Sequence, residues 1–142
     1  MDGPIVVGTD GSPTALKAVL AAAEMATAFS QPLYIVSAYH PKALTAEGLP
    51  AELAGTLTSH SEVDAVLADA ASQAKVKGSK PEVRAVQGDA ADALLDVATE
   101  VDASLLVVGN KGINSMRRFV LGNIPNKVVH NSPCSTLVVQ TT

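Results

Sequence analysis

The sequence predicts an α/β protein with a single, doubly wound parallel sheet of five strands. The first indication is the order of segments, because five short apolar runs alternate with longer stretches of helical periodicity. The second is that most of these runs are almost continuous in Val, Ile and Leu, which is typical of strands buried on both faces. The third is composition: the chain is 47% hydrophobic but only 3% aromatic, so alanine and branched aliphatic side chains must supply the packing.

The first two strands and the helix between them have clear signals. Residues 5–9 form the first apolar run. Ser12 is a favourable helix N-cap, and Pro13 suits the first helical position. Apolar residues then recur at three- and four-residue spacing until about Phe29, which predicts a helix. The run 33–39 is rich in β-forming residues and predicts the second strand.

The middle of the chain is less regular at first. Prolines and glycines interrupt residues 40–57, which predicts a mobile loop or a broken helix. An amphipathic helix is expected over 58–77, with Gly78 as its C-cap. Residues 82–87 alternate and predict a third strand nearer a sheet edge. Gly88-Asp89 then opens another helix. Its inward-facing residues are expected to be Leu94, Leu95, Val97, Ala98 and Val101.

The last third of the chain supplies the remaining elements. Residues 104–108 predict the fourth strand, 124–130 a helix and 135–140 the final strand. Because strand–helix–strand crossovers are right-handed, this order predicts a parallel sheet with helices on both faces. No repeat, linker or low-complexity segment divides the chain, so we expect one domain over residues 1–142.

Three glycines, Gly109, Gly112 and Gly122, follow the fourth strand. Glycine lets a backbone bend sharply and approach a ligand with no Cβ in the way. The N–H groups of such a loop, completed by a helix N-terminus, suit a phosphate, and Asn123 is a favourable N-cap for that helix. The sequence therefore predicts a phosphate-binding loop. The same glycines would also serve as ordinary turns in a protein with no ligand.

Asp10 follows the first strand, and it is the carboxylate best placed to join this loop. Ligands of open α/β sheets bind at the carboxyl ends of strands, where the strand order reverses. If the reversal lies between the first and fourth strands, Asp10 and the glycine loop line one crevice. A carboxylate there suits ribose hydroxyls or a metal ion, and Lys111, Arg117 and Arg118 would add positive charge. The alternatives are an ordinary turn at Asp10 and solvated charge at the two arginines.

Composition excludes several classes of function. The net charge of −4 argues against broad nucleic-acid binding. No apolar run approaches the roughly 20 residues that span a bilayer, and the first residues do not resemble a signal peptide. Cys134 is the single cysteine, so we expect no internal disulfide and a cytoplasmic location.

Catalytic signatures are sparse. The first strand is not followed by the GxGxxG of a dinucleotide site, and the segment from Gly122 to Lys127 lacks the second glycine of a Walker A loop. HExxH and GxSxG are both missing from the sequence, and His40, His60 and His130 lack the spacing of metal ligands. We therefore nominate no catalytic residue and no metal ligand.

Four patterns in order along the whole chain carry a resemblance to a known family. They are the strand and turn at 5–12, the helix start at 88–95, the spacing Gly109-x2-Gly112-x9-Gly122, and Pro133 before the strand 136–139. The glycine spacing is the most specific of the four. Together they resemble the universal stress protein family, in its nucleotide-binding branch.

The resemblance implies a Rossmann-like sheet of the adenine nucleotide alpha hydrolase type, with strand order 3-2-1-4-5. It also implies ATP, cyclic AMP or AMP as the ligand, with Mg²⁺ accompanying ATP. By position, Gly8, Thr9 and Asp10 would meet adenine and ribose, with Ala38 beside the base. Ribose and phosphates would be held by Val108, Gly109, Gly112, Gly122, Asn123 and Ile124. Family members commonly dimerise through the last strand, here between Ser135 and Gln140.

We therefore expect a cytoplasmic, homodimeric protein that binds an adenine nucleotide and acts as a stress-response sensor or nucleotide reservoir, with neither nucleic acid nor membrane as a partner. Asn123 departs from the family's usual Ser or Thr; its amide can donate to phosphate, but its bulk alters the pocket. Ser104 stands where an aspartate is usual. One alternative is a dimeric interaction module that binds no nucleotide. Another is a slow ATPase, which would need a water-activating residue near the γ-phosphate.

Overall fold

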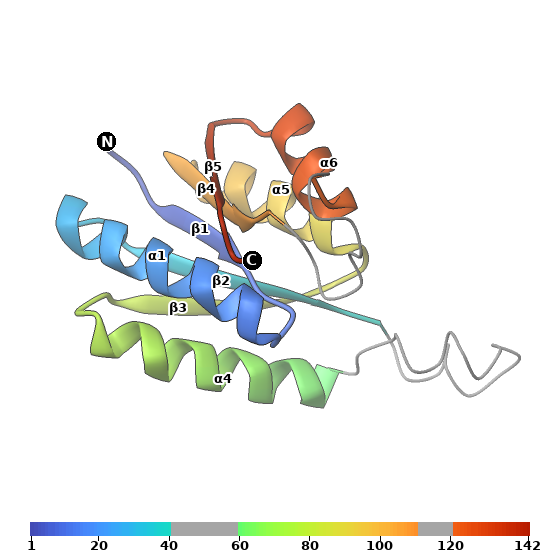
Figure 1. Ribbon diagram of the computed structural model, residues 1–142, viewed down its shortest axis with the longest axis horizontal. Helices are drawn as coiled ribbons and strands as arrows, with labels where there is room; N and C mark the ends of the chain where they lie inside the picture. The colour runs from blue at the N-terminus through green and yellow to red at the C-terminus, as the bar shows by residue number, and fades with distance from the viewer. Residues whose placement is uncertain (41–59, 111–120) are drawn as a thin grey trace, which may run out of the picture.

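In the computed structural model, five parallel strands form one sheet with helices on both sides (Figure 1). The structure describes residues 1–40, 60–110 and 121–142. The elements are β1 (Ile5–Gly8), α1 (Pro13–Phe29), β2 (Leu33–Tyr39), α4 (His60–Val76), β3 (Pro81–Gln87), α5 (Ala90–Glu100), β4 (Leu105–Gly109), α6 (Asn123–Asn131) and β5 (Ser135–Val139). The strand order is β3-β2-β1-β4-β5, which confirms the predicted fold class and order. Residues 41–57 of the segment predicted to be irregular lie outside the described residues.

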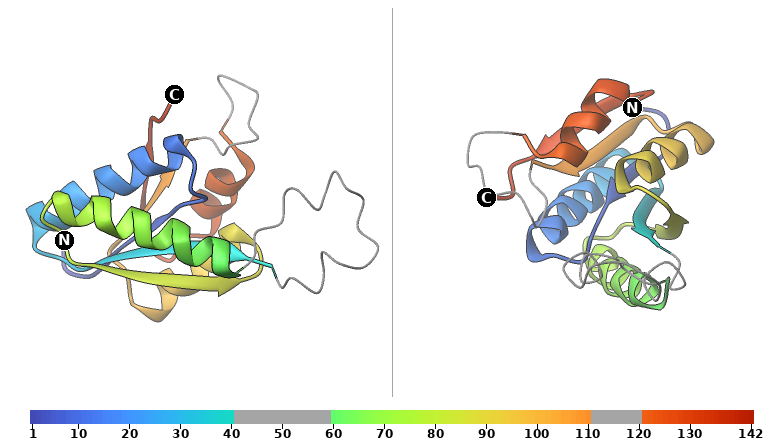
Figure 2. Two further views of the ribbon diagram at one scale, coloured as in Figure 1. Left: turned by 90° about the horizontal axis from the view of Figure 1, so that it is seen from below. Right: turned by 90° about the vertical axis from the view of Figure 1, so that its right-hand side faces the viewer.

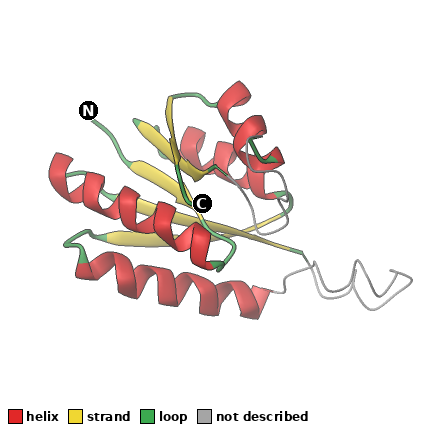
Figure 3. Cartoon of the chain, in the orientation of Figure 1, coloured by secondary structure: helices red, strands yellow, loops and turns green. Residues whose placement is uncertain are grey.

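The central strands β1 and β4 are buried on both faces. Ile5 pairs with Leu105, and Val7 pairs with Val107. These odd-numbered residues pack in one apolar cluster with α1 and α4, whereas the even-numbered Val6, Leu106 and Val108 pack in another with α5 and α6. Figures 2 and 3 show the two helical layers on either side of the strands. Burial on both faces is the reason that these runs show no polar alternation.

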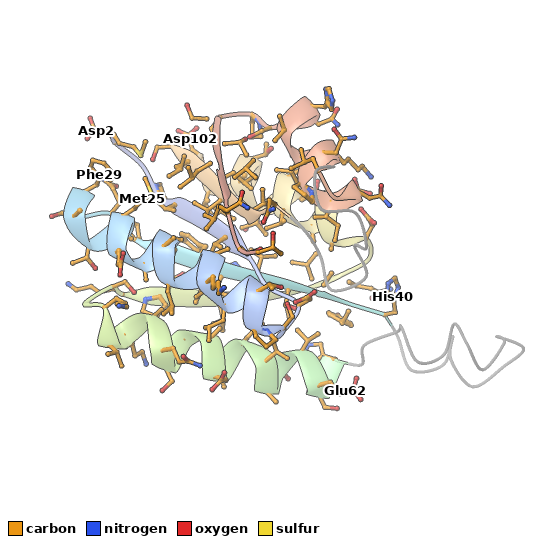
Figure 4. The ribbon with its side chains drawn as sticks, viewed as in Figure 1. Asp2, Met25, Phe29, His40, Glu62 and Asp102 are labelled. Carbon is orange, nitrogen blue, oxygen red and sulfur yellow. The ribbon has the colours of Figure 1, made fainter. Side chains whose placement is uncertain are left out.

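The edge strands are β3 on one side of the sheet and β5 on the other. Val83 in β3 is 43% exposed, which agrees with the edge position predicted from the alternating sequence. The sheet also has two distinct ends (Figure 4): Asp2, Phe29 and Asp102 lie at the amino end, whereas His40 follows β2 at the carboxyl end.

Two helices begin as their local sequences predict. The Ser12 hydroxyl accepts a hydrogen bond from the backbone N–H of Ala15 at 3.1 Å, so Ser12 caps α1. Asp89 caps α5 in the same way, through the N–H of Asp92 at 3.1 Å. Such caps satisfy N–H groups that have no partner within the helix.

None of the helices over the described ranges 1–40, 60–110 and 121–142 has the length and apolar character needed to cross a bilayer.

The cap of α1 gives a stability prediction. We expect Ser12→Ala to lower the free energy of unfolding by about 1 kcal/mol, because it removes the acceptor for the Ala15 N–H. Urea denaturation followed by circular dichroism measures the change. Thr14→Ala is the control, since it removes a second partner of the Ser12 hydroxyl but leaves the cap in place. Equal losses in the two variants would show that the cap is not the source of the stability.

Candidate functional site

A cavity opens at the carboxyl end of the sheet, where β1, β2 and β4 end and α1, α5 and α6 begin. Its lining residues are Gly8, Thr9, Asp10, Ala15, Val36, Ser37, Ala38, Ala90, Leu94, Val108, Gly109, Ile124 and Pro125. The cavity lies beside the neighbours β1 and β4, where the strand order reverses. The structure therefore places the cavity where the crevice was predicted.

Most of the predicted binding residues meet at this cavity. Seven of the nine that the structure describes are among its lining residues, namely Gly8, Thr9, Asp10, Ala38, Val108, Gly109 and Ile124. Gly122 and Asn123 are not among them and directly precede Ile124 along the chain. Gly112, Lys111, Arg117 and Arg118 lie outside the described residues.

The turn after β1 is held by short hydrogen bonds. The N–H of Thr9 donates to the carbonyl of Val36 at 2.9 Å, which ties the end of β1 to β2. The Thr9 hydroxyl accepts from the N–H of Gly11 at 3.1 Å, and Asp10 Oδ1 accepts from the N–H of Ser12 at 2.9 Å. Asp10 is exposed at this turn. Its Oδ2 has no hydrogen bond within the described residues, so this oxygen is available to a ligand.

Two glycines near this turn are required for different reasons. Gly11 has φ of +85°, a left-handed conformation that favours glycine, and a Cβ there would come within 2.8 Å of Val66 Cγ2. Gly8 needs space instead: a Cβ there would come within 2.8 Å of Leu94 Cδ1. Because Gly8 has no side chain, Leu94 of α5 closes over the end of β1 and forms part of the cavity wall.

The cavity wall is mainly apolar. Val36 and Ala38 contribute from β2, Val108 from β4 and Leu94 from α5. Such a wall fits a flat heteroaromatic ring, with a few polar groups at the rim to orient it. The sequence argument missed the other six lining residues, namely Ala15 of α1, Val36 and Ser37 of β2, Ala90 and Leu94 of α5, and Pro125 of α6. The N-cap signal at Ser12 and the helix start predicted at Gly88-Asp89 pointed to the contributions of α1 and α5, because helices that follow parallel strands begin at the same edge.

The start of α6 corrects one prediction. The structure has Gly122 as the N-cap and Asn123 as the first helical residue, whereas Asn123 was predicted to be the cap. The reason lies in the first turn: Pro125 has no N–H, and the N–H of Asn126 donates to the Gly122 carbonyl at 3.0 Å, which sets the cap at Gly122. Gly122 has φ of −63°, which any residue adopts, so the backbone conformation at this position does not require glycine.

An ion-pair cluster lies next to the cavity, at the starts of α5 and α6. Lys127 Nζ is 2.8 Å from Asp92 Oδ1 and 3.4 Å from Asp89 Oδ2. The backbone N–H of Asp92 and the ammonium of Lys127 lower the pKa of Asp89 below its ordinary 3.8. The hydrogen bond from the Lys127 ammonium to the Asp92 carboxylate raises the pKa of Lys127. Lys127 is therefore already paired with the carboxylates of Asp89 and Asp92.

A second hollow lies at the amino end of the sheet, between the C-terminal ends of α1 and α4. The Thr27 hydroxyl donates to the carbonyls of Ala23 and Lys77, and the Ser79 hydroxyl donates to that of Ala74. Since backbone carbonyls already engage these hydroxyls, the carboxyl-end cavity is the better candidate site.

Comparison with known proteins gives a consistent result. A model of the universal stress protein family matches residues 1–140. A universal stress protein of Mycobacterium tuberculosis is 38% identical over 142 aligned positions, which cover 97% of this chain and 96% of the relative. A universal stress protein of Methanocaldococcus jannaschii is 30% identical over 139 positions, which cover 96% of this chain and 81% of that protein.

Solved structures show the same fold. A universal stress protein in complex with cAMP is 36% identical, with a TM-score of 0.76 over 99% of this chain and 98% of that one. The universal stress protein from Archaeoglobus fulgidus in complex with dAMP is 25% identical, with a TM-score of 0.72 over 98% of each chain.

The ion-pair cluster gives a pH-dependent prediction. Because the folded pKa of Asp89 lies below 3.8, ionised Asp89 stabilises the fold at neutral pH, and this contribution is lost as pH falls through the folded value. We expect Asp89→Asn, which keeps a capping oxygen, to be less stable than the wild type at neutral pH. The difference should narrow once pH falls below 3.8. Urea unfolding of both proteins, from neutral pH to below pH 3.8, measures this difference in stability, and Asp2→Asn at an exposed position is the control. A stability difference that does not change with pH would contradict the lowered pKa of Asp89.

Proposed function

This chain belongs to the universal stress protein family, and we propose that it binds an adenine nucleotide in the cavity at the carboxyl end of its sheet. The observation that carries the proposal is the meeting of β1, β4 and the start of α6 around one apolar cavity. The same cavity combines a place for a base, a carboxylate for ribose and a helix N-terminus for phosphate.

The base and ribose would occupy the side formed by β1 and β2. Ala38 and Val36 offer small apolar surface, which leaves room for an adenine ring between β2 and Leu94. Asp10 is the carboxylate of the lining, and Oδ2 is its oxygen without a partner in the described residues. A carboxylate accepts hydrogen bonds from ribose hydroxyls and repels phosphate, so it orients the nucleotide with its phosphate away from β1.

The phosphate would lie at the start of α6. The first N–H groups of a helix have no partner within it and carry the positive end of the helix dipole. At α6 the N–H of Gly122 already donates to the Asn110 carbonyl, and Pro125 has none. The N–H groups of Asn123 and Ile124 remain, which is a pair suited to one phosphate.

Nucleotides with a single phosphate are therefore the ligands that the described residues favour. The related proteins solved with cAMP and dAMP support this choice, since each of those ligands carries one phosphate. Within the described ranges, the start of α6 offers this one pair of free N–H groups to a phosphate. The described residues bring together no group of three His, Cys, Asp or Glu side chains that could hold a metal ion. Mg²⁺ that accompanies ATP is typically bound in part by the phosphates themselves.

The biological role that we propose is a nucleotide sensor or reservoir of the cytoplasmic stress response, working as a homodimer. β5 is an edge of the sheet, so its backbone can pair with a second copy between Ser135 and Gln140. Slow ATP hydrolysis would need a group that activates water, and among the described residues of the cavity lining Asp10 is the one candidate. We therefore favour binding over catalysis.

Equilibrium titration tests the proposal directly. We expect purified protein to bind cAMP or AMP with a Kd well below about 1 mM, and at least as tightly as ATP. Isothermal calorimetry gives all three affinities, and GTP is the control for the base. If none of the adenine nucleotides binds with a Kd below about 1 mM, the proposed function fails, and the alternative of an interaction module that binds no nucleotide is favoured.

Filling the cavity gives a second test. Ala38→Leu adds apolar bulk where the base would lie, so we expect the affinity for cAMP to fall at least about tenfold while cooperative unfolding is retained. Ala38→Ser, which is close to alanine in volume, is the matched control and should bind normally. Normal binding by a folded Ala38→Leu variant would place the base elsewhere.

A further inference from the structure

Asn110 is the point where three segments of the chain meet beside the candidate site. It directly follows Gly109 at the end of β4, and its N–H donates to the Val139 carbonyl of β5 at 2.9 Å. Its carbonyl accepts the N–H of Gly122, the N-cap of α6, at 3.0 Å. One residue thus binds β4, β5 and the start of α6 through its backbone alone.

The Asn110 side chain adds the C-terminal tail to this junction. Asn110 Oδ1 accepts two hydrogen bonds from Thr141, one from the backbone N–H at 2.9 Å and one from the hydroxyl at 2.8 Å. Thr141 is only 2% exposed, so these bonds are shielded from water. Lys17 of α1 donates to the Thr141 carbonyl at 3.1 Å, and the C-terminus lies beside the start of α1 (Figures 1 and 2).

The junction sets the spacing between two halves of the cavity. Gly109 and Ile124 both line the cavity, whereas Asn110 does not. Asn110 is bonded to Gly122, two residues before Ile124, so movement of Asn110 would shift Gly109 and the first N–H groups of α6 relative to each other. From this we infer that Asn110 is a positioning residue for the ligand's phosphate and that Thr141 fixes it, an inference that rests on the proposed function.

The chemistry of Asn110 fits this role. Its amide oxygen has two lone pairs, and Thr141 uses both. An aspartate would accept the same two bonds but would add a negative charge next to the phosphate. A neutral acceptor therefore fixes the tail without opposing an anionic ligand.

Paired substitutions test the inference. We expect Asn110→Ala to weaken cAMP binding roughly tenfold, as the phosphate loses about one well-placed hydrogen bond. Thr141→Val, which keeps the tail's shape, should weaken it in the same direction by a smaller factor. The matched controls are Asn131→Ala and Thr27→Val, which lie outside the cavity lining and remove similar hydrogen bonds, to the carbonyls of Lys127 and of Ala23 and Lys77. Both controls should bind as the wild type does.

A second readout separates this inference from the proposed function. Exchange of the Gly122 amide hydrogen, measured by NMR without ligand, should be faster in Asn110→Ala than in the wild type and unchanged in Asn131→Ala. If the wild type binds nucleotide, equal affinities of wild type and Asn110→Ala overturn the inference. If the wild type binds none, the proposed function fails, and the Gly122 exchange rate alone decides whether Asn110 fixes the start of α6.

Discussion

Burial of β1 and β4 on both faces is the constraint from which the rest of this structure follows. Their side chains point alternately toward α1 and α4 and toward α5 and α6, so both faces are covered. A helix must therefore lie on each side of the sheet, and in a parallel sheet the helix after each strand begins at the carboxyl edge. The ends of β1 and β4 and the starts of α1, α5 and α6 consequently share one cavity. Backbone groups and small side chains form the site because strand ends and helix starts meet at this edge of the sheet.

The two ends of the sheet differ in how many of their polar groups remain free to bind a ligand. At the amino end, the hydroxyls of Thr27 and Ser79 donate to backbone carbonyls, so helix ends and side chains satisfy one another. At the carboxyl end, Asp10 commits one oxygen to its own turn, and the first N–H groups of α6 lack helical partners. Lys127 is bound by two carboxylates. Backbone donors rather than a free lysine are thus what the described part of the cavity presents to an anion.

Local signals predicted most of the fold, and long-range contacts account for what they missed. The cap at Ser12, the helix start at Gly88-Asp89 and the apolar runs of β1, β2 and β4 were predicted correctly, because each depends on neighbours within a few residues. The strand order came from the family resemblance, since periodicity does not say which strands pair. The cap at Gly122 was missed because it depends on the hydrogen bond from the N–H of Asn126, the residue after Pro125, to the Gly122 carbonyl. Two further features join positions that are distant in the sequence: the packing of Leu94 against Gly8 and the hydrogen bonds between Thr141 and Asn110. No sequence pattern predicts such contacts.

The register of the central strands also bears on how the protein is made. Ile5 lies opposite Leu105 in the register of β1 and β4, one hundred positions later in the chain. Pairing over such a separation is slow, because bringing the two distant strands together costs loop-closure entropy before their contacts form. During synthesis β1 and β2 can pair early, but the other edge of β1 stays open until β4 has left the ribosome. For that interval a short, wholly apolar strand edge is exposed, and the cell must keep it from pairing with other chains.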